Sequence, residues 1–257
     1  MKKCRLFYMI FSVLLSILLE TIAIYYGKFI FLITIISFSI LVSNLQKKKN
    51  EIDEIKKIIL EFNMNCDVDM YLIKLNEFRK KCFFTNKQSA YFNLYTVSGY
   101  LEKGDFENAE KMLLEIDEYC NSFNLLGRFI YLKTWCELFF FKNLNEKMKL
   151  SLLRIREIID SVSNPQLKIA LLQSYQSAEA KYFILVNRDV DKVEAFFREK
   201  ANRERSILHK INYNYYHALC LLRLNKVDEG INKLNDLSKI NKNLYSCNQS
   251  ILLLERI

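Results

Sequence analysis

The chain has 257 residues, 51% of them hydrophobic, with only one Pro and five Gly. So few turn-forming residues exclude a sandwich or barrel of many short strands, because each strand would need its own turn. The seven Cys include no C-x-x-C pair and the two His lack metal-ligand spacing, so we expect neither a disulfide framework nor a metal site.

The formal net charge of +9 is concentrated at the N-terminal end of the chain. Residues 1–50 contain seven Lys and Arg against a single acid, whereas residues 51–257 contain 31 basic and 28 acidic residues. A duplex-binding protein needs a concentrated basic stripe, and acidic residues interrupt any such stripe in the larger region. We therefore expect no nucleic-acid partner.

Two apolar segments begin the chain, residues 6–26 and 29–45. As helices they would be about 31 and 25 Å long, close to the roughly 30 Å hydrocarbon core of a bilayer. The short break at Gly27 predicts a transmembrane helical hairpin that forms a domain of its own, residues 1–49. A signal peptide is the alternative, but no small-residue cleavage pattern follows the first segment.

Basic residues flank the two outer ends of this hairpin more densely than its turn. The positive-inside rule then predicts a multi-pass protein of the cell membrane with both termini cytoplasmic. Glu20 and Thr34 each lie seven residues from Gly27, so a tight hairpin would place them at the same depth. A protonated Glu20 would donate a hydrogen bond to Thr34 there, and a proton or ion relay is the functional alternative.

Residues 50–257 have helical spacing of apolar residues almost throughout, which predicts an all-α domain. Short polar breaks interrupt this pattern at intervals of 39, 39, 44 and 38 residues. The breaks are marked by Asn65, Gly104, Asn143, Asn187 and Asn225. Gly and Asn tolerate the left-handed conformation that ends helices, so the spacing predicts about five helix-turn-helix repeats.

The segment YLEKGDFENAEKMLLEI, residues 100–116, resembles the tetratricopeptide signature. Tyr100 occupies the aromatic place on the first helix, Gly104 the turn, and Phe106 and Ala109 the aromatic and small places on the second helix. The small residue lets the paired helices approach closely.

A second segment, residues 221–237, is similar, with Asn225 at the turn and Gly230 as the small residue. The resemblance extends over residues 51–245 and implies an α-solenoid of degenerate tetratricopeptide-like repeats, although the intervening units match poorly. A generic helical bundle is the alternative. The last helix, residues 244–257, is expected to cap the stack or to bind a partner.

The first helix of each tetratricopeptide unit faces a concave groove. Carried over to this sequence, the resemblance places Tyr91, Leu94, Asn212 and Tyr215 in that groove. Tyr provides contact area at little entropic cost and Asn can bond a peptide backbone, so these four residues are candidates for partner binding. Ordinary helix packing is the alternative role for each of them.

No nucleotide-binding or hydrolase motif is present, and His209 and His217 are expected to have packing or surface roles. We therefore expect no enzyme, no catalytic residue, no metal and no small-molecule cofactor. The expected function is a membrane-anchored adaptor or scaffold that binds a protein or peptide at the cytoplasmic face. The alternative is a small membrane effector, such as an immunity or transport accessory protein, whose transmembrane hairpin is the active part.

Overall fold

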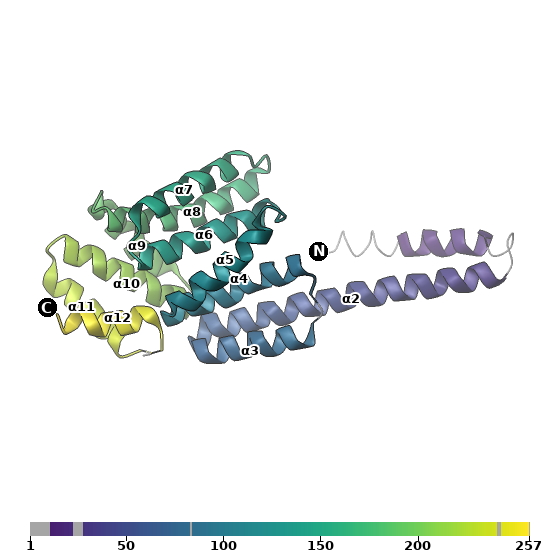
Figure 1. Cartoon of the computed structure of the whole chain (residues 1–257), viewed down its shortest axis with the longest axis horizontal. Coiled ribbons are helices and arrows are strands. Elements are labelled where there is room, and N and C mark those ends of the chain that lie inside the picture. The colour runs from purple at the N-terminus through teal and green to yellow at the C-terminus, as the bar shows by residue number, and fades with distance from the viewer. Residues whose placement is uncertain (1–10, 23–27, 83, 241–242, 257) are drawn as a thin grey trace. The chain divides into compact units, whose positions relative to one another are not determined.

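A computed structural model of the chain describes residues 11–22, 28–82, 84–240 and 243–256, without the side chains of residues 28–34. All regular secondary structure in these residues is α-helical, which confirms the predicted all-α class (Figure 1). The chain divides into two compact units, Met1–Lys56 and Lys57–Ile257. We call them the N-terminal unit and the C-terminal unit and describe each by itself.

The helices follow one another with short connections. Residues 11–22 are helical, and the later helices are α2 (Lys28–Asn65), α3 (Val68–Lys81), α4 (Asn86–Lys103), α5 (Phe106–Cys120), α6 (Leu125–Phe141), α7 (Asn145–Asp160), α8 (Pro165–Leu185), α9 (Val190–Arg203), α10 (Ile207–Arg223), α11 (Val227–Ser238) and α12 (Tyr245–Leu254). The predicted domain border after residue 49 falls inside α2, which continues to Asn65 without a break.

The structure corrects the predicted membrane location. Among the residues that it describes, no helix combines the length and the apolar character needed to cross a membrane. This finding contradicts the predicted multi-pass hairpin with spans over residues 6–26 and 29–45 and cytoplasmic termini.

Only one side of the predicted contact between Glu20 and Thr34 falls within the described residues. Glu20 lies exposed on the helix over residues 11–22. The side chain of Thr34 lies outside the described residues, and so does Gly27, the expected turn.

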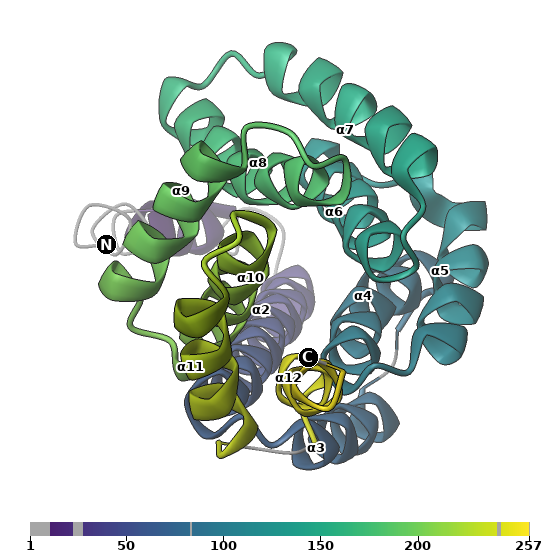
Figure 2. The same ribbon diagram turned by 90° about the vertical axis from the view of Figure 1, so that its left-hand side faces the viewer.

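From α3 to α12, each helix of the C-terminal unit packs against the next one along the chain. In addition, α4 contacts α6, α6 contacts α8, and α8 contacts α10, so alternate helices form a second set of neighbours. Figure 2 shows the result: α4, α6, α8, α10 and α12 lie on the inside, and α5, α7, α9 and α11 lie on the outside. This sequential packing is consistent with a helical repeat.

Four of the five predicted turn residues have the expected backbone conformation. The φ angles of Gly104, Asn143, Asn187 and Asn225 are 84°, 58°, 54° and 58°. At the first turn the positive φ, 59°, falls on Cys66, one residue after the predicted Asn65. Gly and Asn populate this conformation at low steric cost, so they end the first helix of each pair where the sequence indicates.

The backbone hydrogen bonds at these four turns are the same. At the first of them the Gly104 N–H donates to the Leu101 carbonyl at 3.1 Å, and the Asp105 N–H donates to the Tyr100 carbonyl at 2.9 Å. These two bonds define a Schellman motif. The equivalent pairs recur after α6, α8 and α10, at 2.8 to 3.3 Å. The four turns thus share one backbone geometry even where the side chains differ.

The small residues of the two matching segments lie at helix crossings. Ala109 is fully buried, and a Cβ added at Gly230 would lie 2.8 Å from the Leu222 Cδ2 atom of α10. Tyr100 and Phe106 are half-buried and pack against the same core cluster as Ala109. In α7 the larger Met148 is fully buried at the equivalent place, so the position belongs to the core in that unit as well.

The last helix folds back onto the beginning of the C-terminal unit. α12 packs against α4, α10 and α11. Its Tyr245 ring lies 5.0 Å from the Phe106 ring, 4.6 Å from the Phe141 ring and 6.4 Å from the Tyr215 ring, measured between centroids. The last helix therefore closes the inner row of helices between α10 and α4.

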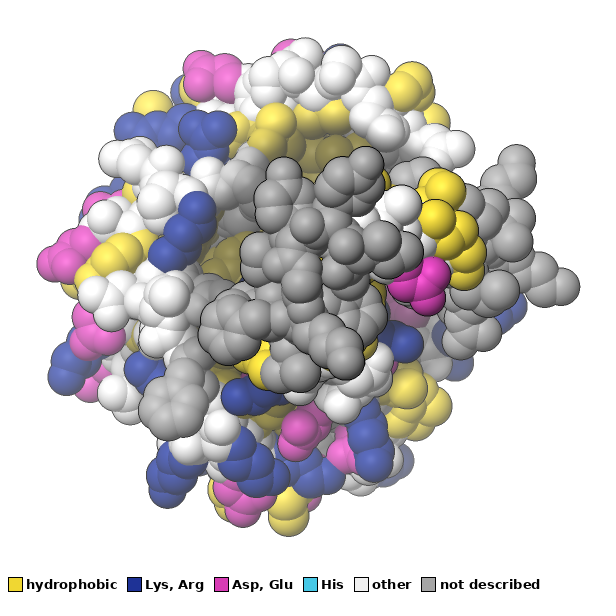
Figure 3. Space-filling view, turned by 90° about the vertical axis from the view of Figure 1, so that its right-hand side faces the viewer, with side chains coloured by type: hydrophobic (Ala, Val, Ile, Leu, Met, Phe, Trp, Pro, Cys, Tyr) yellow, Lys and Arg dark blue, Asp and Glu magenta, His cyan; other side chains and the backbone are white. Residues whose placement is uncertain are grey.

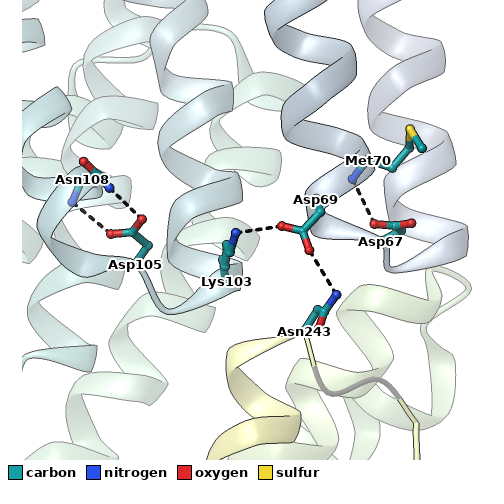
Figure 4. A network of polar contacts seen from close by, with 7 residues as sticks. All are labelled: Asp67, Asp69, Met70, Lys103, Asp105, Asn108 and Asn243. Carbon is teal, nitrogen blue, oxygen red and sulfur yellow. Dashed lines mark hydrogen bonds and ion pairs between the residues drawn. The ribbon is translucent and has the colours of Figure 1, made fainter.

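Polar contacts tie the same two ends together (Figure 4). The Asp69 carboxylate on α3 accepts from Lys103 Nζ of α4 at 2.8 Å and from Asn243 Nδ2, just before α12, at 3.1 Å. Nearby, Asp67 and Asp105 cap the N-termini of α3 and α5 by accepting from backbone N–H groups three residues later. One carboxylate thus joins three segments of the unit.

Candidate functional site: the central cavity

A cavity of about 390 Å³ lies among the inner helices α4, α6, α8 and α10 of the C-terminal unit. Ligand sites in proteins commonly have volumes of roughly 300 to 1,000 Å³. The wall combines aromatic rings with charged and amide side chains. Its aromatic part includes Tyr91, Phe129 and Tyr213, and its most polar part consists of Glu102, Lys133, Glu137, Lys181 and Asn212.

Helical spacing explains how each wall is assembled. On α10 the lining residues are His209, Asn212, Tyr213 and Tyr216, which are three or four positions apart or adjacent and so share one face. On α6 the charged residues Lys133 and Glu137 are four positions apart and face the cavity together.

Three of the four predicted groove residues meet in this cavity. Tyr91 and Leu94 line it from α4, and Asn212 lines it from α10. The fourth, Tyr215, is buried beside the wall, with its ring centroid 5.7 Å from that of Tyr216 and 6.4 Å from that of Tyr245. α12 covers the face of α10 that carries Tyr215.

A buried ion pair crosses the cavity wall. Lys181 of α8 donates to the Glu137 carboxylate of α6, and the Lys181 ammonium also lies 4.5 Å from the centroid of the Tyr216 ring. Burial acts to raise the pKa of Glu137, but Lys181 and Lys133 outweigh it and lower this pKa below the ordinary value. Glu137 is therefore ionised at neutral pH, and its charge is matched by Lys181.

Lys133 faces the cavity without a hydrogen bond or ion pair to any residue that the structure describes. Burial lowers its pKa, and the nearby Glu137 offsets part of this effect. A lysine ammonium has three N–H donors, so Lys133 presents donor capacity to whatever occupies the cavity.

Glu102 of α4 belongs to a second polar group. Asn212 Nδ2 donates to both Glu102 oxygens, at 2.9 and 3.0 Å, and Ser246 of α12 donates to Asn212 Oδ1 at 3.0 Å. Burial raises the pKa of Glu102 to about 7, although the Asn212 bond and Lys181 act in the opposite direction. Near neutral pH this carboxyl group is therefore divided between its protonated and ionised forms.

The polar residues of α6 and α4 were missed by sequence reasoning. α6 is apolar over most of its length, and Lys133 and Glu137 interrupt it with an i,i+4 spacing that marks one polar stripe. Isolated charges on an otherwise apolar helix could have indicated that these two residues face a polar site. Glu102 had no such signal, because it lies next to Lys103 at the end of a mixed helix.

The two histidines both lie on α10 but in different surroundings. His209 lines the cavity, and burial lowers its pKa. His217 is buried elsewhere, with Nε2 2.6 Å from Glu194 Oε1 of α9. The described part of the chain contains no group of three His, Cys, Asp or Glu side chains arranged to hold a metal ion.

The cysteine thiols in the described core are poor nucleophiles. Cys136 and Cys220 are fully buried, and burial raises the pKa of each thiol to about 12. A nucleophilic cysteine needs its thiolate form. These two side chains pack as small apolar residues between helices.

On the outer surface the charges are mixed. Figure 3 shows Lys and Arg side chains interspersed with Asp and Glu over the described part of one face. This distribution lacks the concentrated basic stripe of a nucleic-acid-binding surface on the face in view.

Comparison of the chain with protein-family models, with curated proteins and with solved structures finds no match in any of the three.

Proposed function

We propose that the C-terminal unit is a tetratricopeptide-like helical repeat that acts as an adaptor, and that it binds a short peptide segment of a partner protein in its central cavity. The observation that carries this proposal is the meeting of Tyr91, Leu94 and Asn212, from helices far apart in the sequence, in one cavity. Aromatic rings offer contact area to peptide side chains, and amide groups can bond the peptide backbone.

The regular turns support the repeat assignment. Four helix pairs share the same Schellman bonds, and the second helix of each matching pair places a small buried residue, Ala109 or Gly230, at the crossing. These features accompany the tetratricopeptide signature in the sequence. About five helix pairs, beginning with the end of α2 and α3, make up the proposed repeat.

The size and position of the cavity favour a short segment over a broad protein surface. It is bounded on four sides by α4, α6, α8 and α10, and α12 closes the inner row between α10 and α4. Only a few residues of a partner can enter such a space at once. The proposed mode of action is binding without chemistry, since the two carboxylates of the wall are engaged, Glu137 with Lys181 and Glu102 with Asn212.

The proposal is tested by selecting binders from a random heptapeptide library with the full chain as bait. Enriched peptides are then synthesised and titrated against the unmodified protein and the Asn212→Ala and Tyr91→Ala variants. We expect each substitution to weaken binding by tenfold or more, as is common when a central contact is removed.

Asn232→Ala serves as the matched control, because Asn232 is exposed on α11, away from the cavity. It should leave the affinity unchanged. Far-ultraviolet circular dichroism and thermal unfolding of each variant separate a lost contact from a lost fold. A library that yields no binder, or binders insensitive to both cavity substitutions, would contradict the proposal.

A further inference from the structure

We propose that the cavity recognises a carboxylate of its peptide ligand, that this carboxylate pairs with Lys133, and that Glu102 takes up a proton when it binds. This inference rests on the proposed peptide-binding function and specifies its chemistry.

The first argument is the donor capacity of Lys133. Two of the four charged groups in the wall, Lys181 and Glu137, satisfy each other, whereas Lys133 has no hydrogen-bond or ion-pair partner among the described residues. Lys133 is half-buried, and the nearby Glu137 is already bonded to Lys181, so a ligand carboxylate would supply charge-assisted hydrogen bonds to Lys133. The adjacent rings of Phe129 and Tyr213 would pack against the rest of the ligand.

The second argument is the charge count around the cavity. Lys133 and Lys181 are positive, Glu137 is negative, and burial favours the neutral form of His209. With Glu102 protonated the wall has one excess positive charge, which matches a monoanion such as a carboxylate. A dianion, such as a phosphate ester, would leave one negative charge unmatched beside Glu137.

The third argument concerns the groups that act on Glu102. Lys181 of α8 favours its ionised form and Glu137 of α6 opposes it. Within the described residues, the other titratable groups that interact with Glu102 are Tyr71, Tyr216 and Cys66. Burial raises the pKa of each, so that all three are neutral near pH 7. Glu102 and Lys133 line the same cavity of about 390 Å³, so a ligand carboxylate in this cavity would add a negative charge that favours the protonated form of Glu102.

The test begins with peptides from the heptapeptide selection, each prepared with a free C-terminus, as the C-terminal amide, and with Asp or Glu side chains converted to Asn or Gln. These forms distinguish a terminal carboxylate from a side-chain carboxylate. We expect either the C-terminal amide or the Asn and Gln peptide to bind at least tenfold more weakly than the peptide with its carboxylates. In the Lys133→Met variant this preference for a carboxylate should be lost. Lys149→Met on the exposed face of α7 is the charge-matched control and should leave the preference intact.

Proton uptake is measured by calorimetric titration of the same peptides at pH 7.5 in phosphate and in Tris, whose ionisation enthalpies differ. We expect uptake of a measurable fraction of one proton per peptide bound, and none in the Glu102→Gln variant. Lys133→Arg retains the positive charge and should retain the carboxylate preference. It shows whether the effect of Lys133→Met comes from the lost charge or from a folding defect. Absence of proton uptake in the unmodified protein would overturn the coupling to Glu102.

A second probe separates this inference from the peptide proposal. Benzoate and its neutral isostere benzamide are titrated against the full chain, and the Lys133 resonance is followed by NMR. Peptides that bind equally well as carboxylates and as amides would overturn the inference and leave peptide binding intact. Benzoate binding that depends on Lys133, in a protein that binds no peptide, would support the anion site and contradict the peptide proposal. Binding of neither probe class would overturn both.

Discussion

The side-chain amide of Asn212 lies 2.9 and 3.0 Å from the two carboxylate oxygens of Glu102, although 110 positions separate these residues in the sequence. Ser246 of α12 bonds the same amide at 3.0 Å. α4, α10 and α12 thus meet at one polar point on the wall of the cavity. The side chains of Glu102 and Asn212 therefore both line the cavity and hold α12 against the inner helices.

The first prediction concerns the pH dependence of stability. Burial raises the pKa of Glu102 to about 7 from an ordinary value of 4.5. Between pH 4.5 and pH 7, Glu102 is therefore mostly protonated in the folded protein and mostly ionised in the unfolded chain. Stability should therefore fall as pH rises from 4.5 to 7 and then level off. Glu102→Gln should remove this loss and stabilise the protein at pH 8 by about 1 to 3 kcal/mol.

Urea unfolding of the unmodified protein and of Glu102→Gln at several pH values measures this difference. The two proteins should have similar midpoints at pH 4.5 and diverge as pH rises. A Glu102→Gln protein that is less stable than the unmodified protein at pH 8 would show that Glu102 is stabilising in its ionised form.

The second prediction concerns the left-handed turn residues. Gly104 has a φ of 84°, and a Cβ added there would lie 2.9 Å from Tyr245 Cδ2. Gly104→Ala should therefore destabilise the fold by about 1 to 2 kcal/mol or more. Asn225→Gly, at the equivalent turn, is the control and should change stability by less than about 0.5 kcal/mol. Chemical denaturation compares the two, and equal effects would contradict the strain at Gly104.

The third prediction concerns the shared core. Ala109 has no exposed surface and packs beside Leu113 and Ile116 in the cluster of α4, α5 and α6. Ala109→Trp should force these helices apart and destabilise the protein by about 1 to 3 kcal/mol or more. Ala170→Trp, on the exposed side of α8, should be nearly neutral in the same thermal unfolding assay. A neutral effect at Ala109 would remove it from the core.

The fourth prediction concerns the last helix. Tyr245 packs its ring among those of Phe106, Phe141 and Tyr215, so Tyr245→Ala should cost about 2 to 4 kcal/mol of stability. Hydrogen exchange measured by mass spectrometry should show faster exchange in α12 and at the end of α4. Unchanged exchange in both segments would mean that α12 is held by other contacts.

The turns were the most predictable feature of this fold, because their chemistry is local. Gly and Asn at Gly104, Asn143, Asn187 and Asn225 adopt the left-handed conformation with little help from the rest of the chain. Cys66 was missed because nothing in its residue type indicates a positive φ.

The candidate site was only partly predictable, because the phase of each helix depends on tertiary packing. The tetratricopeptide register placed Tyr91, Leu94 and Asn212 on the inner face, where they line the cavity. Tyr215 lies beside the cavity because α12 occupies its face of α10. Charged residues in a helical sequence are usually solvated, so the inward positions of Glu102 and Lys133 could not be read from residue type.

For the N-terminal segments, apolar composition alone was weak evidence for membrane spans. The spans were predicted from apolar runs of 21 and 17 residues. Among the described residues no helix combines the length and the apolar character needed to cross a membrane, so these runs were not sufficient evidence for a span.

Photo-crosslinking tests the central claim, that the cavity is the peptide site, most directly. A library-selected peptide carrying a benzophenone side chain is irradiated with the full chain, and the adducts are located by mass spectrometry. We predict adducts on the cavity-lining residues of α4, α6 and α10, with Tyr91, Phe129 and Tyr213 foremost, and their loss in Asn212→Ala. Adducts confined to the outer helices α5, α7, α9 or α11 would contradict the account.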